Sequence, residues 1–205
     1  MDIQEFERGA DLNLPPEQVF DFLKDVKLMM DLTPFFEVKA VEKLTEGPLS
    51  EGSRYKLDLV DDVTEQDASD EITIEEYEER HRIAWAFEKE ERRVIFEVRP
   101  RGRGSRLMVK EIYHLPGGVT SGYIDRLSRD HLLWIRSIAQ YLRLYEKNTF
   151  YHRMMRWVMN KIWLPMTPSQ RRIALLILLI QGVVLLAFVF GALMLYLKGI
   201  IEGLL

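Results

Sequence analysis

An uninterrupted apolar run in the last part of the chain limits its possible folds more than any other feature. From Ile173 to Leu197 the 25 residues include no charged side chain, and Gln181 is the only strongly polar one. A helix of this length extends to roughly 37 Å and can cross a hydrocarbon core of about 30 Å. A buried helix of a soluble protein is usually shorter and has a polar edge. The run therefore predicts a transmembrane helix over 173–197, followed by a short tail over 198–205.

Charge divides the rest of the chain into two parts. Residues 1–142 hold 20 Lys+Arg against 30 Asp+Glu, a net charge of −10, whereas residues 143–172 hold seven basic residues against one acidic residue, a net charge of +6. An acidic body argues against a nucleic-acid partner, because phosphate binding needs a basic face. Basic residues beside a membrane helix mark its cytoplasmic side. We therefore expect the body to be cytoplasmic. The chain has no cysteine, so it has no disulfide or thiolate metal site.

Residues 1–146 have the length and the pattern of one mixed domain. Pro15-Pro16-Glu17 predicts a helix start after a first strand over 3–12. Alternating apolar residues predict further strands over 54–59, 82–87, 93–98 and 106–115, with a hairpin turn at Arg101-Gly102-Arg103-Gly104-Ser105. Apolar residues at helical spacing then predict one long helix over 121–146. The order of elements indicates an α+β fold, with a curved and mostly antiparallel sheet around a long C-terminal helix.

Several segments of this body resemble a known superfamily. They are Leu14-Pro15-Pro16-Glu17-Gln18-Val19-Phe20-Asp21-Phe22-Leu23, Asp25-Val26, Pro34, Gly47-Pro48-Leu49 and Glu51-Gly52-Ser53-Arg54. Together they are similar to the START-like (SRPBCC) superfamily, which includes polyketide cyclase/dehydrase-like and coenzyme Q-binding proteins. The resemblance implies a helix-grip fold with a deep hydrophobic cavity between the sheet and the C-terminal helix. With its added membrane segment, the chain resembles a family of membrane-anchored carbon monoxide dehydrogenase subunits, although a short basic-aromatic segment replaces the long linker of that family.

Polar residues fall on the faces that should line this cavity. If Leu107 and Val109 face inward, the two-residue period of a strand also turns Glu111 and Tyr113 inward, and His131 lies on the inner stripe of the long helix. These groups would orient the polar end of a ligand or move protons. The alternative is a hydrogen-bonded core histidine and a bulge that turns Glu111 outward. The expected ligand-binding residues are Trp85, Phe87, Phe96, Val109, Glu111, Tyr113, Ile124, Leu127, His131, Trp134 and Ile138.

Two further segments are expected to contact lipid. A cavity gate is predicted in a short connection at Met29, Met30, Pro34, Phe35 and Phe36, with core packing as the alternative. Residues 147–172 form a basic-aromatic juxtamembrane segment, and the alternation of aromatic, methionine and basic residues over 150–164 predicts an interfacial amphipathic helix and not a solvated linker. The interface residues are Arg153, Arg156, Trp157, Lys161, Trp163, Arg171 and Arg172.

These features predict a membrane-anchored protein that binds or transfers a hydrophobic small molecule, a quinone or another isoprenoid lipid, at the cytoplasmic membrane surface. One alternative is an accessory structural subunit of a membrane complex, bound through small residues of the transmembrane helix. The other is a cyclase or dehydratase with Glu111 and His131 as acid and base. The pattern favours binding over catalysis and predicts no catalytic residue. The four histidines show no metal-ligand spacing, so no metal is expected, and no cofactor other than a bound quinone or lipid.

Overall fold

The computed structural model describes residues 2–61 and 66–204. The chain forms two compact units, Met1–Pro165 and Met166–Leu205. We call the first unit the body. It includes residues 147–165, which the sequence pattern assigned to a separate juxtamembrane segment.

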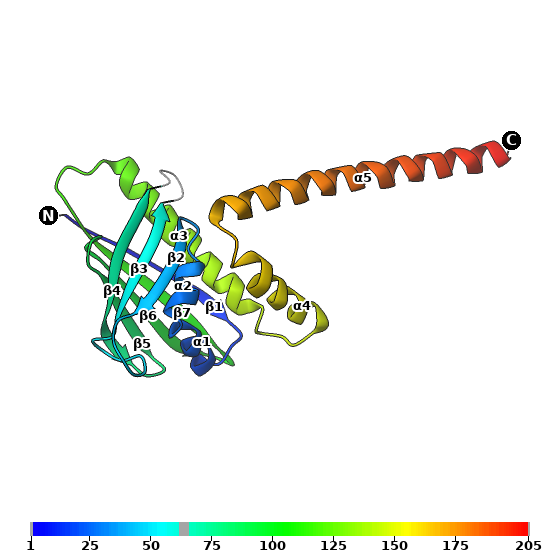
Figure 1. Ribbon diagram of the computed structural model, residues 1–205. Coiled ribbons are helices and arrows are strands. Elements are labelled where there is room, and N and C mark those ends of the chain that lie inside the picture. Colours follow the sequence, from blue (N-terminus) through cyan, green and yellow to red (C-terminus); the bar gives the residue numbers. More distant parts are fainter. Residues whose placement is uncertain (1, 62–65, 205) are drawn as a thin grey trace. The chain divides into compact units, whose positions relative to one another are not determined.

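A seven-stranded antiparallel sheet forms one layer of the body and curves around helices (Figure 1). The strand order is β1-β7-β6-β5-β4-β3-β2, so the first strand pairs with the last one and the other neighbours are consecutive in sequence. The strands are β1 (Asp2–Leu12), β2 (Phe36–Lys43), β3 (Arg54–Asp61), β4 (Asp67–Glu78), β5 (Arg82–Phe87), β6 (Arg92–Arg101) and β7 (Gly104–Leu115). This is the α+β helix-grip architecture that the sequence predicted. The sequence reading had placed no strand at β2 or β4.

Glycine shapes the corner at which β6, β7 and the end of β1 meet. Gly102 has a φ of 59°, in the left-handed region, and lies in the two-residue turn between Arg101 and Gly104. A Cβ atom at Gly104 would overlap the backbone carbonyl oxygen of Leu12. The close approach of β1 to β7 therefore depends on glycine at this position.

Two short helices connect β1 to β2. Helix α1 (Pro16–Leu23) has proline in its first turn and buries Val19, Phe20 and Leu23. Helix α2 (Val26–Asp31) begins after Asp25, whose side chain accepts a hydrogen bond from the backbone N–H of Leu28 at 2.9 Å. Met29 and Met30 thus lie on a helix and not in the connecting stretch that the sequence suggested.

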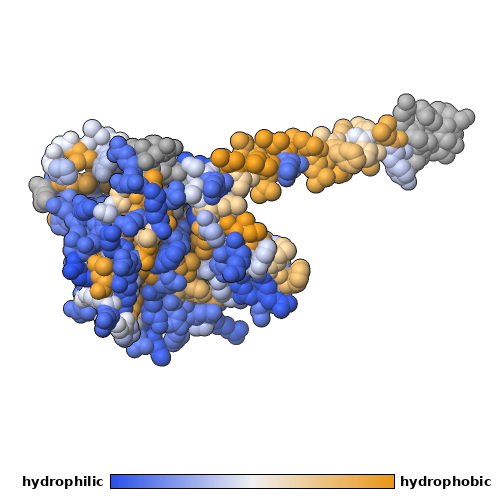
Figure 2. Space-filling model, viewed as in Figure 1, coloured by the Kyte–Doolittle hydropathy of each residue, from blue (hydrophilic) through white to orange (hydrophobic). Residues whose placement is uncertain are grey.

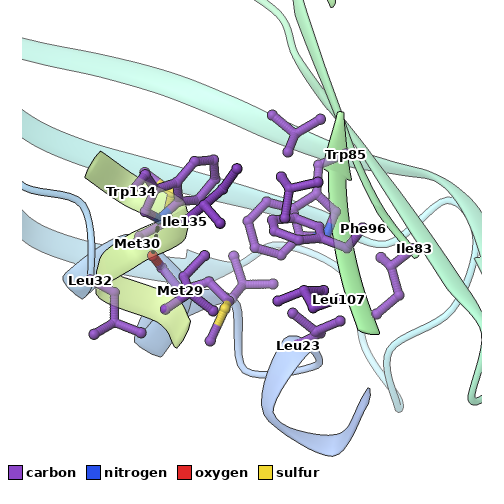
Figure 3. Close-up of a cluster of buried hydrophobic side chains, with 14 of the residues drawn as sticks. Leu23, Met29, Met30, Leu32, Ile83, Trp85, Phe96, Leu107, Trp134 and Ile135 are labelled. Atoms are coloured by element: carbon purple, nitrogen blue, oxygen red, sulfur yellow. Dashed lines mark hydrogen bonds between the residues drawn. The ribbon is translucent and has the colours of Figure 1, made fainter. Parts of the chain in front are cut away.

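The long helix α3 (Ser121–Arg143) packs its second half against the centre of the sheet. The ring of Phe96 lies 4.8 Å from the Trp85 ring and 5.7 Å from the Trp134 ring, centroid to centroid. The indole N–H of Trp134 donates a 3.0 Å hydrogen bond to the backbone carbonyl of Met29. Figure 3 shows these residues among the close-packed side chains of the core. The centre of the body is therefore filled by large apolar side chains.

Two further helices follow α3 within the body, and one long helix forms most of the second unit. The first two are α4 (Phe150–Val158) and the π-helix η1 (Met159–Trp163). Helix α5 (Pro168–Leu204) contains an apolar stretch, Ser169–Tyr196, that is long and apolar enough to cross a membrane. Figure 2 shows hydrophobic residues along this helix, whereas the visible face of the body is largely hydrophilic. The predicted span over 173–197 falls within α5.

Candidate functional site

A pocket of about 700 Å³ opens at one end of the sheet. Its walls come from the α2–β2 connection, the β5–β6 turn, the end of β7 and the first half of α3. The lining residues are Thr33, Phe35, Phe36, Lys89, Glu90, Glu91, Arg92, Glu111, Tyr113, His114, Leu115, Pro116, Tyr123, Arg126, Leu127, Asp130, His131 and Trp134. The pocket thus lies beside the packed centre and does not run through it.

Glu111 is the hub of a polar cluster in the pocket wall. Strand β7 pairs with β1 and β6 without a register shift, so the alternation that buries Val109 also buries Glu111 and Tyr113. The hydroxyl of Tyr113 donates a 2.9 Å hydrogen bond to Glu111 Oε2. His131 Nδ1, on α3, lies 3.1 Å from the same oxygen. The inward orientation of Glu111 that the sequence indicated is therefore present, and the bulge that would have turned it outward is not.

Arg92 provides the positive charge of this cluster. It pairs with Tyr113 in the β6–β7 register, and its Nη1 lies 3.8 Å from Glu111 Oε1. Its Nε lies 3.0 Å from Glu90 Oε2, and the guanidinium carbon lies 4.0 Å above the centre of the Phe87 ring. The guanidinium is therefore held between two carboxylates and an aromatic face, an arrangement that stabilises a cation in a partly buried position.

The pKa shifts in the cluster follow from this arrangement. Burial alone would raise the pKa of Glu111, but the contacts with His131, Arg92 and Tyr113 outweigh it and hold that pKa below its ordinary value. Burial opposes the charge of Arg92, yet the carboxylates of Glu90 and Glu111 and the contact with Tyr113 raise the pKa of Arg92. Burial raises the pKa of the Tyr113 hydroxyl, which stays protonated and able to donate. The cluster is thus an ion pair with a neutral phenol beside it.

His131 has hydrogen-bonding capacity that the described part of the chain does not use. Its Nδ1 contacts Glu111 without hydrogen-bond geometry, and its Nε2 has no partner among the described residues. The ring is buried and packs near Phe6, with 6.2 Å between the ring centres. Buried polar atoms are usually hydrogen-bonded. This histidine is therefore the cluster member best suited to bind the polar end of a ligand.

The structure divides the eleven predicted ligand-binding residues into two groups. Glu111, Tyr113, Leu127, His131 and Trp134 line the pocket. The remaining six do not. Of these, Ile124 is half-buried, and the other five lie in the packed interior: Trp85, Phe87, Phe96, Val109 and Ile138. The difference arises because aromatic side chains fill the space that a deep cavity would need.

The predicted gate is divided in the same way. Phe35 and Phe36 are half-buried and line the pocket, whereas Met29 and Met30 are fully buried in the core (Figure 3). Pro34 is half-buried between these groups and does not line the pocket. Sequence reasoning missed Arg92 and its neighbours in the β5–β6 turn. The run of charged residues from Glu88 to Arg93 between two apolar strands was the signal that could have located them.

The predicted membrane-interface residues belong to both units. On α4, Arg153 and Trp157 are exposed, while Arg156 donates a 2.8 Å hydrogen bond to Asn148 Oδ1. Lys161 is exposed and Trp163 half-buried, both on η1. Arg171 and Arg172 lie in the first turns of α5.

Comparison with solved structures shows the same fold in three proteins of low sequence identity. A crystal structure of Ara h 8.0201 has a TM-score of 0.54 at 17% identity and covers 69% of this chain and 98% of its own. Protein CV1439 from Chromobacterium violaceum has a TM-score of 0.52 at 15% identity and covers 68% of this chain and 98% of its own. Protein NE0264 from Nitrosomonas europaea has a TM-score of 0.53 at 13% identity and covers 69% of this chain and 96% of its own. Comparison with curated proteins gives no significant match.

The sequence itself matches a family model over residues 4–128, which include the sheet from the third residue of β1 onward and the first part of α3. This family is described as polyketide cyclase / dehydrase and lipid transport. The fold agrees with this match, and so does the pocket between the strand ends and the long helix. The chain belongs to the polyketide cyclase / dehydrase and lipid transport family.

Proposed function

We propose that the protein binds a hydrophobic small molecule with a polar end, a quinone or another isoprenoid lipid, and exchanges it with the bilayer in which α5 is anchored. The observation that carries this proposal is the pocket of about 700 Å³ at the end of the sheet. This volume lies within the range of roughly 300–1,000 Å³ that is typical of small-molecule sites. The family and the helix-grip fold support binding of a hydrophobic ligand.

The pocket wall offers two kinds of side chain. Phe35, Phe36 and Leu127 provide apolar surface for a hydrocarbon or ring, while Arg92, Glu111 and His131 provide charge and hydrogen-bonding groups. A carbonyl or hydroxyl at the end of the ligand would contact the polar group of residues. Because the centre of the body is packed, we expect the ligand to occupy the end pocket and not a cavity through the domain.

An anchor that keeps the body at the bilayer would lower the cost of ligand exchange. Each CH₂ group left in water costs about 0.8 kcal/mol, so an isoprenoid chain is transferred most easily where the protein meets the bilayer. Helix α5 is apolar enough to provide such an anchor. The seven basic residues of 143–172 argue for a cytoplasmic body. Protease added to sealed right-side-out vesicles should then leave the body intact, and digestion of the body there would contradict this orientation.

The binding proposal is tested by filling the pocket in the full-length protein. Leu127→Trp places a larger side chain in the pocket wall, whereas Leu133→Trp makes the same change at an exposed position of α3 outside the pocket. We expect the first variant to bind a short-chain quinone about tenfold more weakly, a loss of about 1.4 kcal/mol, and the second to bind normally. Mass spectrometry of lipid extracted from gently purified protein identifies the natural ligand. If both variants bind the short-chain quinone with equal affinity, the quinone does not bind in the pocket.

The contribution of Phe35 and Phe36 to the pocket wall can be tested separately. Replacing Phe35 and Phe36 with Ser should slow ligand exchange with vesicles but leave the fold intact, because both side chains are half-buried and line the pocket. A transfer assay between two vesicle populations measures the rate, and circular dichroism checks the fold. Unfolding of this variant would assign the two residues to the core.

The 3.1 Å contact between Glu111 and His131 also supports a second candidate, an enzyme that moves a proton on an apolar substrate. In that case His131 Nε2 is the group that meets the substrate. His131→Gln should then abolish product formation while the ligand still binds. Recovery of only unchanged ligand from the wild-type protein would leave binding as the function.

A further inference from the structure

Helix α4 and η1 expose a row of large apolar side chains. Phe150 is 75% exposed and Trp157 is 58% exposed, and Tyr151, Met154 and Ile162 are exposed as well. No residue of α4 or η1 is fully buried. Phe150, Met154 and Trp157 follow one another at intervals of four and three residues, which places them on one face of α4. Clusters of this kind on a protein surface mark a contact with a partner or a membrane.

The opposite side of this segment is fastened to the end of α3. Asn160 Oδ1 accepts a 3.0 Å hydrogen bond from the Tyr141 hydroxyl, and Asn160 Nδ2 lies 3.3 Å from the Tyr145 hydroxyl. The guanidinium of Arg156 lies 5.1 Å from the centre of the Tyr145 ring. Met159 and Leu164 pack against the hydrophobic core. The segment is therefore a fixed part of the body and not a flexible linker.

The π-helical turn explains how the segment faces two ways. A π turn is wider than an α turn and changes the direction of the residues that follow it. Asn160 lies within this turn, where it reaches Tyr141 and Tyr145, while Trp157 on the preceding helix stays exposed. With the inner side held by hydrogen bonds, the exposed aromatic row has a defined direction on the body.

Chain length and charge identify what this surface meets. Only four residues separate Leu164, the residue after η1, from Ser169, where the apolar stretch of α5 begins, so the two are at most about 18 Å apart. Arg153 and Lys161 flank the exposed aromatic side chains. Glu146, the one acidic residue of 143–172, accepts hydrogen bonds from Asn13 at 2.8 and 3.1 Å. The surface is thus aromatic and basic, and it is tied to a membrane helix.

We propose that α4 and η1 form a rigid membrane-contact surface for anionic phospholipid. Its aromatic rings lie at the headgroup level of the bilayer, and Arg153 and Lys161 contact lipid phosphates. Rings and cations in this arrangement are typical of helices in the plane of the interface. This inference rests on α5 as the membrane anchor of the proposed function. It adds that the body contacts the bilayer through one defined face, which the hydrogen bonds among Tyr141, Tyr145 and Asn160 hold in place.

The test uses full-length protein in nanodiscs whose phospholipids are brominated near the glycerol end of the acyl chains. Bromine quenches a nearby indole, and Trp157 is exposed while Trp85 and Trp134 are buried. In a Trp163→Phe background, we expect quenching that is lost in the further variant Trp157→Phe. A control reporter, Leu133→Trp in a background that lacks both Trp157 and Trp163, should stay unquenched because it lies elsewhere on the body.

The charge requirement is tested with the same reporter. Quenching should be stronger in discs that contain phosphatidylglycerol than in discs of phosphatidylcholine alone, since each basic residue near an anionic surface contributes about 1 kcal/mol. Arg153→Gln with Lys161→Gln should remove this difference, whereas Arg8→Gln with Arg103→Gln, exposed cations on β1 and in the β6–β7 turn, should keep it.

Alkaline carbonate extraction separates failure of this surface from failure of the anchor. Unquenched Trp157 in a protein that resists extraction would overturn the contact surface and leave the anchor in place. Release of the wild-type protein by carbonate would overturn the anchor and, with it, the contact surface. If Trp157 is unquenched and native mass spectrometry shows two chains per disc, the surface binds a second copy and the lipid proposal is wrong.

Discussion

The two halves of α3 face different surroundings. The first half, from Tyr123 to Asp130, borders the pocket with exposed and half-buried side chains, several of them charged. The second half buries Trp134, Ile138 and Leu142 against the aromatic centre of the body. His131 lies at the junction, between the polar cluster and the core. One helix thus contributes binding surface at one end and stability at the other.

Because of this division, ligand binding and the stability of the body can be changed independently. Ile138 and Leu142 in the second half are buried outside the pocket wall, whereas the residues from Tyr123 to Asp130 are exposed or half-buried. Trp134 and the cluster around Glu111 and His131 are the exceptions, because they are both buried and part of the pocket wall. Substitutions along α3 can therefore test which positions contribute to ligand binding and which contribute to core packing.

The largest effect is expected in the second half of α3. Ile138 is fully buried, so Ile138→Ala should lower the free energy of unfolding by about 2–5 kcal/mol, the usual cost of an emptied core position. Leu127→Ala in the pocket wall is half-buried and should cost about 1 kcal/mol or less. Urea denaturation of the full-length protein in mild detergent measures both.

The pair also tests whether the centre of the body is filled. If Ile138 borders a deep cavity, as the family resemblance first suggested, its truncation enlarges an existing space and costs little. A small loss of stability at Ile138, together with weaker quinone binding, would contradict the packed centre. A large loss with unchanged binding would confirm that the ligand site lies at the end of the sheet.

A smaller effect is expected at the junction. Glu111→Gln keeps the size of the side chain but removes the charge that accepts the Tyr113 hydrogen bond and faces Arg92 and His131. Hydrogen bonds to charged groups contribute about 1.5–3 kcal/mol, and we expect a loss in this range at neutral pH. Thermal unfolding of the two proteins in the same detergent measures the difference.

The pH dependence gives the sign of this contribution. The pKa of Glu111 is lower in the folded protein than its ordinary value of 4.5, mainly through His131 and Arg92 acting against burial. Its stabilising contribution is therefore complete above that ordinary value and is lost as the pH falls through the folded value. The difference in the free energy of unfolding between wild type and Glu111→Gln should therefore become smaller below about pH 4.5. If this difference becomes larger in acid, Glu111 is protonated in the folded protein. Burial and, to a smaller extent, the charge of Glu111 raise the pKa of Asp130, so Asp130 adds a smaller contribution that also differs between the two proteins.

Much of the fold could be predicted because the sheet repeats a simple period. The alternation of Ile83, Trp85 and Phe87 and the glycines of the β6–β7 turn located β5 to β7 closely. Strand β2 was missed because the register shifts between Val38 and Ala40 and breaks the alternation. Helix α2 has only six residues, too few for a helical period to be visible.

The candidate site was only partly predictable. Periodicity placed Glu111, Tyr113 and His131 on inward faces, and the structure brings them together. The position of the pocket depends on how completely Trp85 and Phe96 fill the centre, and no sequence period reports side-chain packing. Arg92 reaches the cluster through the register of β6 with β7, a pairing that the chain determines only when folded.

The smallest effect is expected beyond the end of α3, where Asn160 fastens η1 to Tyr141 and Tyr145. Asn160→Ala removes these hydrogen bonds and leaves the one between the two tyrosines, so we expect a loss of about 0.5–1.5 kcal/mol. The loss should be local, because the buried half of α3 stays packed. Hydrogen exchange in residues 150–163 should become faster by up to about tenfold while the core strands stay protected. Ser137→Ala, which removes only a hydrogen bond to Leu133 within α3, should leave these residues unchanged. Equal exchange in both variants would show that the apolar contacts of Met159 and Leu164 and the contact of Arg156 with Tyr145 hold this segment on the body without the hydrogen bonds of Asn160.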